Sequence, residues 1–171
     1  MEELCDRLAG DLDGSFEELV KAVRDDLYSG LRPLHGFEAE DLAQEALVRA
    51  YRALSGYEPD RIRTLRLRPW IWTIALNLSR NRARDRARRP TPVELVDTHG
   101  VDDPEPLDTT AWDARLASLP LAQRRAVVLR HVVDLSYPEI AEITGRPEGT
   151  IKADVSRGLA RLRTIMREEE E

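Results

Sequence analysis

The sequence has little of the chemistry that metal centres and disulfide frameworks need. Cys5 is the only cysteine among the 171 residues, and only three histidines occur, at His35, His99 and His131. A lone thiol cannot close an internal disulfide, and histidines scattered in this way do not have the spacing of a zinc site. We therefore expect no metal and no cofactor, and a redox role for Cys5 has no support.

Long apolar runs and an amino-terminal targeting pattern are also missing. No stretch approaches the roughly 18 apolar residues of a membrane-spanning helix, and the first residues lack the pattern of a signal peptide. No cluster of histidine, cysteine, serine or paired acids stands beside a phosphate-binding loop. These absences predict a cytoplasmic protein without membrane insertion, and they make an enzyme the least favoured class.

Charges of both signs are abundant and strongly segregated. The formal net charge is −6, but residues 61–90 contain ten arginines and a single aspartate, and residues 114–167 contain ten bases and five acids. Residues 1–60 have 15 acids and six bases, and residues 91–113 have seven acids and no base. Two basic blocks on a chain that otherwise repels nucleic acid predict two nucleic-acid-binding surfaces.

Apolar periodicity predicts two amphipathic helices in the first third of the chain. Residues 1–14 are acidic, and we expect them to form a loose or short helical lead-in. A helix is expected to begin at Ser15, with Glu18 three positions later completing a capping box. A second helix is expected over residues 38–54, because its apolar residues recur on one face.

A longer helix is predicted after an arginine-rich loop at residues 55–69. Residues 70–89 run without a helix-breaking residue, apolar in the first half and basic in the second. Aromatic rings and guanidinium planes stack on unpaired bases while arginines hold the backbone, so this combination is typical of proteins that bind melted DNA. Trp70 is expected in the core. For Trp72, packing in the core and stacking on a base stay equally open.

The stretch after this helix, residues 91–110, is rich in proline and acid and has no periodicity. We interpret it as an extended linker whose charges repel one another. A passive tether and an acidic strand that imitates nucleic acid in a basic channel are both compatible with this composition.

The most specific motif lies between Asp134 and Arg163. Tyr137-Pro138-Glu139 begins a helix, and Gly145 can adopt the positive φ that a helix end often needs. Pro147-Glu148 begins a second helix, whose apolar residues recur at spacings of 4, 4 and 3 and whose opposite face is polar and basic. Two helices joined by a short glycine turn predict a helix-turn-helix, with an ordinary helix pair as the alternative.

Together these patterns predict an all-α chain of two small helical domains joined by an acidic flexible linker. The expected boundaries are a lead-in over residues 1–14, a first domain over 15–90, the linker over 91–110, a second domain over 111–167 and an acidic tail over 168–171.

In this order of motifs the chain resembles the bacterial extracytoplasmic-function (ECF) sigma factors, group IV of the sigma-70 family, over almost its whole length. Residues 40–51, EDLAQEALVRAY, are similar to the family's helix that binds core RNA polymerase. Residues 70–77, WIWTIALN, resemble the signature ahead of its −10-binding helix. LASLP at 116–120, YPEIA at 137–141 and GTIK at 149–152 resemble the blocks of its −35-binding domain.

The resemblance implies a function, in which the chain directs core polymerase to promoters, the first domain recognises and melts the −10 element and the helix-turn-helix binds the −35 element. The residues expected to bind core polymerase by this similarity are Asp41, Leu42, Gln44, Glu45 and Arg49. Those expected at the −10 element are Arg61, Arg63, Arg66, Arg68, Trp72, Asn77, Arg80, Asn81 and Arg84. Those expected at the −35 element are Glu148, Thr150, Lys152, Asp154, Ser156, Arg157 and Arg161.

Three residues depart from the family pattern. Asn81 stands where an aspartate is usual, and Asp154 occupies a position of the recognition helix that is often basic. An acid that faces DNA can accept a hydrogen bond from cytosine N4 but repels phosphate, so we expect Asp154 to tune −35 specificity. Gly158 replaces a usual alanine and should cost its helix about 1 kcal/mol.

The partners implied by the resemblance are core RNA polymerase, through the coiled coil of its largest subunit and the flap of the second subunit, promoter DNA and an anti-sigma factor. The free chain is expected to be a monomer. A stand-alone helix-turn-helix regulator is the main alternative, but such a protein normally needs a dimer interface, and no spare apolar face is visible for one. A helical adaptor that binds no DNA is the second alternative, against which the ten arginines of residues 61–89 weigh.

Overall fold

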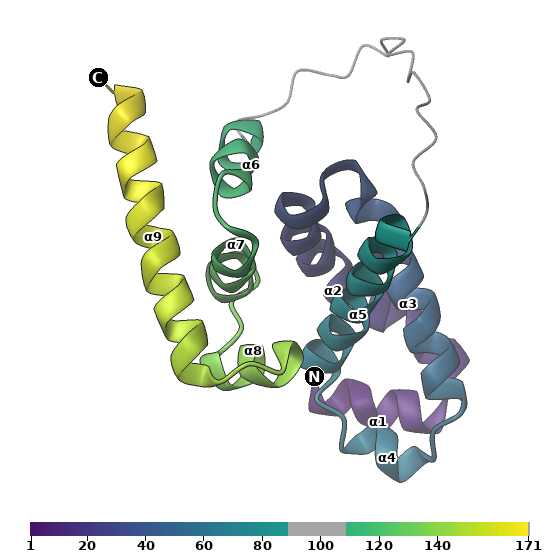
Figure 1. The fold of residues 1–171 in the computed structure, drawn as a ribbon. Helices are drawn as coiled ribbons and strands as arrows, with labels where there is room; N and C mark the ends of the chain where they lie inside the picture. Colours follow the sequence, from purple (N-terminus) through teal and green to yellow (C-terminus); the bar gives the residue numbers. More distant parts are fainter. Residues whose placement is uncertain (89–108, 171) are drawn as a thin grey trace, which may run out of the picture.

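Every regular element in the residues that the structure describes, 1–88 and 109–170 of this computed structural model, is helical (Figure 1). The prediction of an all-α chain in two small helical units is confirmed. The linker predicted over residues 91–110 and the last residue of the long helix predicted over 70–89 lie outside the described residues, apart from the linker's last two positions. The helices are α1 (Glu2–Gly10), α2 (Leu12–His35), η1 (Gly36–Glu38), α3 (Ala39–Ser55), α4 (Pro59–Arg63), α5 (Leu67–Arg88), α6 (Thr109–Ala117), α7 (Leu121–Val127), η2 (Val128–Val132), α8 (Tyr137–Thr144) and α9 (Glu148–Glu170).

The first unit packs α2, α3 and α5 around one apolar core, which the spacing of their leucines, isoleucines and alanines produces. Leu27 of α2, Leu42 of α3 and Ile71 of α5 are each at most 1% exposed. Helices α1 and α4 lie against each other beside this core, and α1 also packs on α2. The predicted lead-in is therefore a helix of the first unit, attached through its own buried apolar residues.

The start of α2 differs from the prediction, because Asp11 and not Ser15 is the N-cap. The Asp11 side chain accepts a hydrogen bond from the Gly14 backbone N–H at 3.0 Å, so the N-cap lies four residues earlier than predicted and Gly14 lies in the first turn. In α1 the Cys5 thiol is buried, and this burial raises its pKa above the ordinary value of 9.0. A thiol with a raised pKa holds less thiolate, so Cys5 is an unreactive core residue.

The predicted loop at residues 55–69 contains a short helix, α4, with Pro59 in its first turn. Helix α5 begins at Leu67, three residues before the predicted start, and continues as one helix as far as Arg88. The prediction of a single helix with an apolar first half and a basic second half is confirmed over this range.

The second unit consists of α6, α7, η2, α8 and α9, with α7 packed along α9. Its core includes Leu129, Ile140 and Ile151, each at most 1% exposed. Helix α9 extends to Glu170 and therefore includes most of the predicted acidic tail. Glu169 of this tail forms an ion pair with Arg115 of α6 at 2.7 Å.

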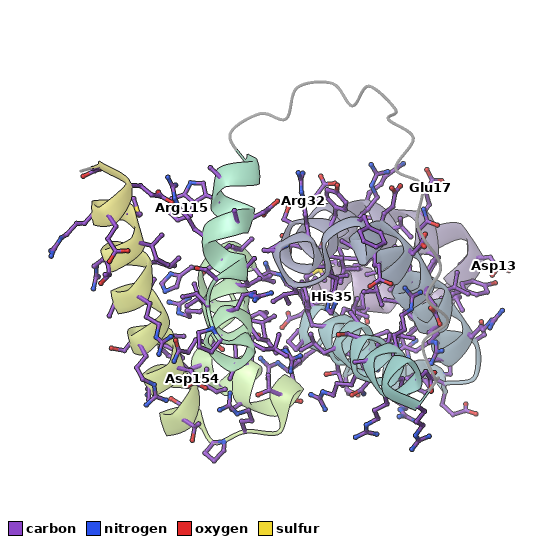
Figure 2. All side chains as sticks on the ribbon, turned by 45° about the horizontal axis from the view of Figure 1, so that its top comes forward. Asp13, Glu17, Arg32, His35, Arg115 and Asp154 are labelled. Atoms are coloured by element: carbon purple, nitrogen blue, oxygen red, sulfur yellow. The ribbon has the colours of Figure 1, made fainter. Side chains whose placement is uncertain are left out.

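The two units lie side by side, and α8 contacts α5 while α6 and η2 contact α2 (Figure 1). A Cβ atom placed on Gly30 of α2 would stand 2.5 Å from the Trp72 ring and 2.6 Å from the Val133 side chain. Gly30 therefore allows a close approach of η2 to the first unit. Arg32, on the side of the first unit that faces the second in Figure 2, pairs with Asp113 at 2.9 Å. We call this arrangement of the two units the closed arrangement.

Candidate nucleic-acid and polymerase interfaces

Helices α8 and α9 form the predicted helix-turn-helix, and local signals fix its turn. Ser136 accepts a hydrogen bond from the Glu139 backbone N–H, and the Glu139 carboxylate accepts one from the Ser136 backbone N–H at 2.8 Å, which makes a capping box. Gly145 ends α8 in the left-handed conformation at φ 67°, where a Cβ would be strained. The sequence contained the Ser136–Glu139 spacing of this cap, but the prediction placed the helix start without it.

The outer face of α9 carries polar and basic side chains that can reach a DNA groove. Lys152, Ser156, Arg157 and Arg161 are exposed, and the two remaining predicted residues that lie outside the core, Glu148 and Thr150, are half-buried at the start of the helix. Lys152 pairs with Glu148 at 2.7 Å, and this hydrogen bond raises the pKa of Lys152 above 10.5, so the side chain stays charged. A helix in the major groove reads bases with side chains of this kind.

Asp154 does not face DNA in this structure, contrary to the expectation that it tunes specificity directly. The residue is 4% exposed, and its carboxylate pairs with Arg146 at 2.7 Å and with Arg157 at 2.8 Å. Burial raises its pKa, but the hydrogen bonds from Arg157 and Arg146 outweigh burial and hold the pKa below the ordinary 3.8. Asp154 therefore positions two arginines beside the turn. The spacing of apolar residues did not predict the burial of Asp154, because a buried ion pair breaks the apolar pattern.

The basic half of α5 presents a second polar face. Asn77, Asn81 and Arg84 are exposed at spacings of 4 and 3, which place them along one side of the helix, and Arg80 is half-buried beside them. Amide and guanidinium groups in such a row can hydrogen-bond base edges and phosphates.

Both tryptophans of α5 belong to the packed half of the helix. Trp72 is 1% exposed, so it is a core residue here and its predicted stacking on a −10 base does not fit the closed arrangement. A Cβ on Gly30 would meet both the Trp72 ring and the Val133 side chain, so the ring lies close to the second unit. Trp70 is half-buried and packs against the core and the Tyr57 ring, with the ring centroids 6.0 Å apart.

The four arginines predicted from the loop between α3 and α5 are all engaged with side chains or backbone of the chain itself. Arg61 lies over the Tyr57 ring at 3.6 Å, and Arg63 pairs with Asp60 at 2.7 Å. Arg66 pairs with Glu139 at 2.7 Å and Glu142 at 3.2 Å, across the boundary between the units. Arg68 pairs with Asp26 at 2.7 Å and donates to the Val133 carbonyl.

The predicted polymerase-binding residues separate into a surface set and a buried one. Asp41, Gln44 and Arg49 are exposed on α3, and Glu45 accepts hydrogen bonds from Arg49 at 2.8 Å and Arg82 at 2.7 Å. Leu42 is 1% exposed and packs in the core, so it cannot touch a partner directly. The packing of Leu42 in the core explains why the motif at residues 40–51 has a leucine at this position. The hydrogen bond from Arg82 is the largest cause that lowers the pKa of Glu45, and it links α3 to α5.

Sequence reasoning did not single out Arg125 of α7, although the structure places it next to Arg80, which is one of the residues predicted at the −10 element. Arg125 is half-buried between α7 and α5, and its Nε atom is buried without a hydrogen-bond partner among the residues that the structure describes. No periodicity could have found it, because its surroundings come from the other unit.

Neither a metal centre nor a membrane span is visible in the described parts of the chain. No group of three or more histidine, cysteine, aspartate or glutamate side chains in residues 1–88 and 109–170 could hold a metal ion. None of the helices in these ranges is long and apolar enough to cross a membrane.

Comparisons with known proteins find relatives for both helical units. The family model "Sigma-70 region 2" matches residues 19–89, and "Sigma-70, region 4" matches residues 110–162. The chain is 30% identical to the ECF RNA polymerase sigma factor SigW of Bacillus subtilis (strain 168), with 93% of the chain and 92% of that protein covered. It is 34% identical to the ECF RNA polymerase sigma factor SigE of Mycolicibacterium smegmatis, over 89% of the chain and 62% of that protein.

A solved structure has the same arrangement of helices. It is the sigma factor RpoE in complex with the anti-sigma factor NepR from Bartonella quintana, with a TM-score of 0.72 and 28% sequence identity. The similarity covers 89% of the chain and 96% of that protein, so it includes both helical units.

Proposed function

The chain belongs to the ECF sigma factors of the sigma-70 family, and from this premise we propose how its surfaces divide the work of promoter recognition. As a sigma factor it directs RNA polymerase to promoters. In the division that we propose, residues 15–90 together with α1 form the domain that binds core polymerase and the −10 element. Residues 111–167 form the domain that binds the −35 element, and residues 91–110 connect them.

The observation that carries this division is the pair of exposed polar helix faces, one on each unit. Asn77, Asn81 and Arg84 of α5 are exposed beside Arg80, and Lys152, Ser156, Arg157 and Arg161 are exposed on α9 after a helix-turn-helix. One monomeric helix-turn-helix makes few phosphate contacts and binds duplex DNA weakly. Two such faces tethered to one polymerase make each contact effectively intramolecular, so that the combined site becomes selective.

Melting of the −10 element needs no bond chemistry by this protein. The α5 face binds unpaired bases better than paired ones, and this preference moves the duplex toward its open form. The exposed α3 residues Asp41, Gln44 and Arg49 form the proposed contact with the coiled coil of the largest polymerase subunit. The flap of the second subunit is the proposed contact of the second unit, and the place of action is the cytoplasm with the polymerase.

Regulation by an anti-sigma factor is part of the same proposal. The similar RpoE is bound to the anti-sigma factor NepR, and both units of this chain share its arrangement of helices. In the closed arrangement Arg66 and Arg68 are occupied by residues of the second unit and of α2. A protein that holds the two units together would keep these arginines from DNA.

The experiment that tests the proposal maps transcription starts on fragmented genomic DNA with purified core polymerase, with and without this chain. New starts that share two spaced sequence elements are expected. The absence of new starts, combined with DNA binding by the chain alone, would favour the stand-alone regulator instead. If the chain neither produces new transcription starts nor binds DNA, the helical adaptor is favoured over both the sigma factor and the stand-alone regulator.

A further inference from the structure

A hollow of about 410 Å³ lies where the basic half of α5 meets α7, and both units line it. Leu34 and Leu121 form an apolar wall, and Arg80, Arg84 and Arg125 also line the hollow. Its size falls within the range of small-molecule sites in proteins. His35, labelled in Figure 2 on the first unit, is part of the lining too.

The other polar groups of this hollow already have partners. Arg82 donates a hydrogen bond to Glu45 at 2.7 Å, and His35 and Ser79 share a hydrogen bond of 2.9 Å. Among the described residues of the lining Glu38 is the only one with a carboxylate, and it too takes part in an interaction within the chain. Arg80, Arg84 and Arg125, in contrast, form no ion pair with any residue that the structure describes.

Closing the two units brings like charges together at this place. Burial lowers the pKa of Arg125, and the charges of Arg80 and Arg146 lower it further. Arg146 shares its charge with Asp154, but Arg80 has no such neighbour among the described residues. The buried and unpaired Nε atom of Arg125 adds an unsatisfied donor to this repulsion. A bound anion would relieve both the repulsion between the arginines and the unsatisfied donor of Arg125, because it supplies negative charge and acceptor oxygens to both units at once.

We propose that the hollow between α5 and α7 is a binding site for a phosphate-bearing small molecule, held by Arg80, Arg84 and Arg125, and that this ligand stabilises the closed arrangement. A phosphate group carries nearly two negative charges at neutral pH and three acceptor oxygens, which match several guanidinium forks better than a single carboxylate does. The leucine wall accepts an apolar or aromatic body attached to that phosphate.

The ligand is expected to oppose promoter binding, a consequence that rests on the proposed function. Arg125 belongs to α7 and Arg80 to α5, so the complete site exists only while the units are closed. A ligand that binds one arrangement better than the other shifts the population toward it. Arg80 cannot hold the ligand and a −10 phosphate together, so the two compete.

The test is calorimetric titration of the full chain with sodium pyrophosphate, at constant ionic strength. One molecule per chain should bind, and the melting temperature should rise with ligand concentration. Arg125→Gln should weaken pyrophosphate binding by roughly tenfold or more. The variant loses one charge-assisted hydrogen bond and the attraction between the Arg125 charge and the negative charge of pyrophosphate. Arg52→Gln, an exposed arginine of α3 outside the hollow, should bind as the natural chain does.

Two further readouts separate a ligand site from a merely structural role. Without ligand, Arg125→Gln should melt at a temperature equal to or above that of the natural chain, because repulsion from Arg80 is removed. Sodium acetate at equal ionic strength should give no saturable binding. Saturable binding of acetate, or pyrophosphate binding unchanged in Arg125→Gln, would overturn the proposal.

A single-stranded oligonucleotide distinguishes a small molecule from nucleic acid as the source of the phosphate. Arg80→Ala should weaken both pyrophosphate and the oligonucleotide, whereas Arg125→Gln should weaken pyrophosphate alone. If Arg125→Gln loses binding of the oligonucleotide but keeps binding of pyrophosphate, the hollow is a DNA-binding site instead. If start mapping fails while pyrophosphate still binds through Arg125, the proposed function is wrong and the binding site remains.

Discussion

Asp154 shows how a single buried charge organises the second unit. Its carboxylate is 5% exposed and bridges Arg146 beside the turn and Arg157 on the outer face of α9. Such a pair gives little net stability compared with apolar packing, but removing one member leaves the other groups without their partner. The residue therefore controls where Arg157 is presented.

Asp154→Asn is expected to destabilise the second unit by about 1–3 kcal/mol at neutral pH. The pKa of Asp154 is below 3.8 in the folded chain, so its contribution is fully present above the unfolded-state pKa and is lost as pH falls through the folded pKa. Urea unfolding at pH 7 and near pH 3 checks this, and the difference between the two chains should shrink at the lower pH. Asp60→Asn, at a side chain that is 96% exposed, is the control and should change nothing measurable. An equal loss at both pH values would show that the charge of Asp154 is not the cause.

Arg80→Ala and Arg157→Ala are each expected to weaken promoter use roughly tenfold, because each side chain can supply a contact to base or phosphate worth about 1–3 kcal/mol. Neither residue lies on the α3 face, so binding to core polymerase should stay unchanged. Transcription from a mapped promoter measures the first effect and co-sedimentation with core polymerase the second. Loss of polymerase binding in either variant would mean that the DNA surface is misplaced.

At the scale of the element, the contact of α9 with α7 explains a glycine that helix propensity disfavours. A Cβ on Gly158 would stand 2.6 Å from Cγ2 of Val127, a buried β-branched side chain with little freedom to move. Alanine would favour the helix by about 1 kcal/mol, yet it would overpack this contact. The glycine that looks costly in the sequence is therefore what allows the two helices to approach.

Gly158→Ala is expected to lower the free energy of unfolding by about 1–2 kcal/mol, because overpacking exceeds the gain in propensity. Gly149→Ala is the matched control on the same helix, since nothing lies within 4 Å of its added Cβ and its φ is not positive. That variant should be neutral or more stable by about 0.5–1 kcal/mol. Thermal unfolding measures the stability of both glycine variants. A second substitution, Val127→Ala, should reduce the loss of stability in Gly158→Ala. A stabilised Gly158→Ala chain would contradict the close contact.

At the scale of the whole molecule, polar contacts and one close apolar approach hold the two units together. Arg66 reaches Glu139 and Glu142 of α8, Arg32 pairs with Asp113, and Gly30 lets Val133 approach the first unit. Contacts between exposed charges are weak one by one and are screened by salt. We therefore expect the closed arrangement to be easily shifted, which the proposed binding of DNA by both units requires.

Glu142→Arg is expected to open the closed arrangement, because Arg66 then faces a like charge at a site where it had an acid 3.2 Å away. A compact chain of this length has a radius of gyration of about 16 Å, and small-angle X-ray scattering should show a larger value for the variant. Glu142→Gln, which removes the acid without adding a like charge, should keep a radius closer to the compact value, because the ion pair of Arg66 with Glu139 at 2.7 Å remains. Glu40→Arg, on the exposed part of α3, controls for the change in net charge. An unchanged radius in Glu142→Arg would show that the contact of Arg66 with Glu142 is not needed to keep the units closed.

The sequence by itself determined the class of the fold and most of its helices, because helical periodicity, caps and breakers act within a few residues. The single helix α5, the left-handed Gly145 and the i, i+4 pair of Glu45 with Arg49 follow from such local rules. The family resemblance predicts both recognition faces from motifs that are continuous in sequence.

Only the tertiary structure decided which polar and aromatic residues are buried and which distant charges meet. It placed Trp72 and Leu42 in the core, turned Asp154 inward and brought Arg125 beside Arg80 from another helical unit. It also showed why Gly158 is glycine. These outcomes depend on packing between segments far apart in the chain, and periodicity within one segment contains no information about the surface that another segment will cover.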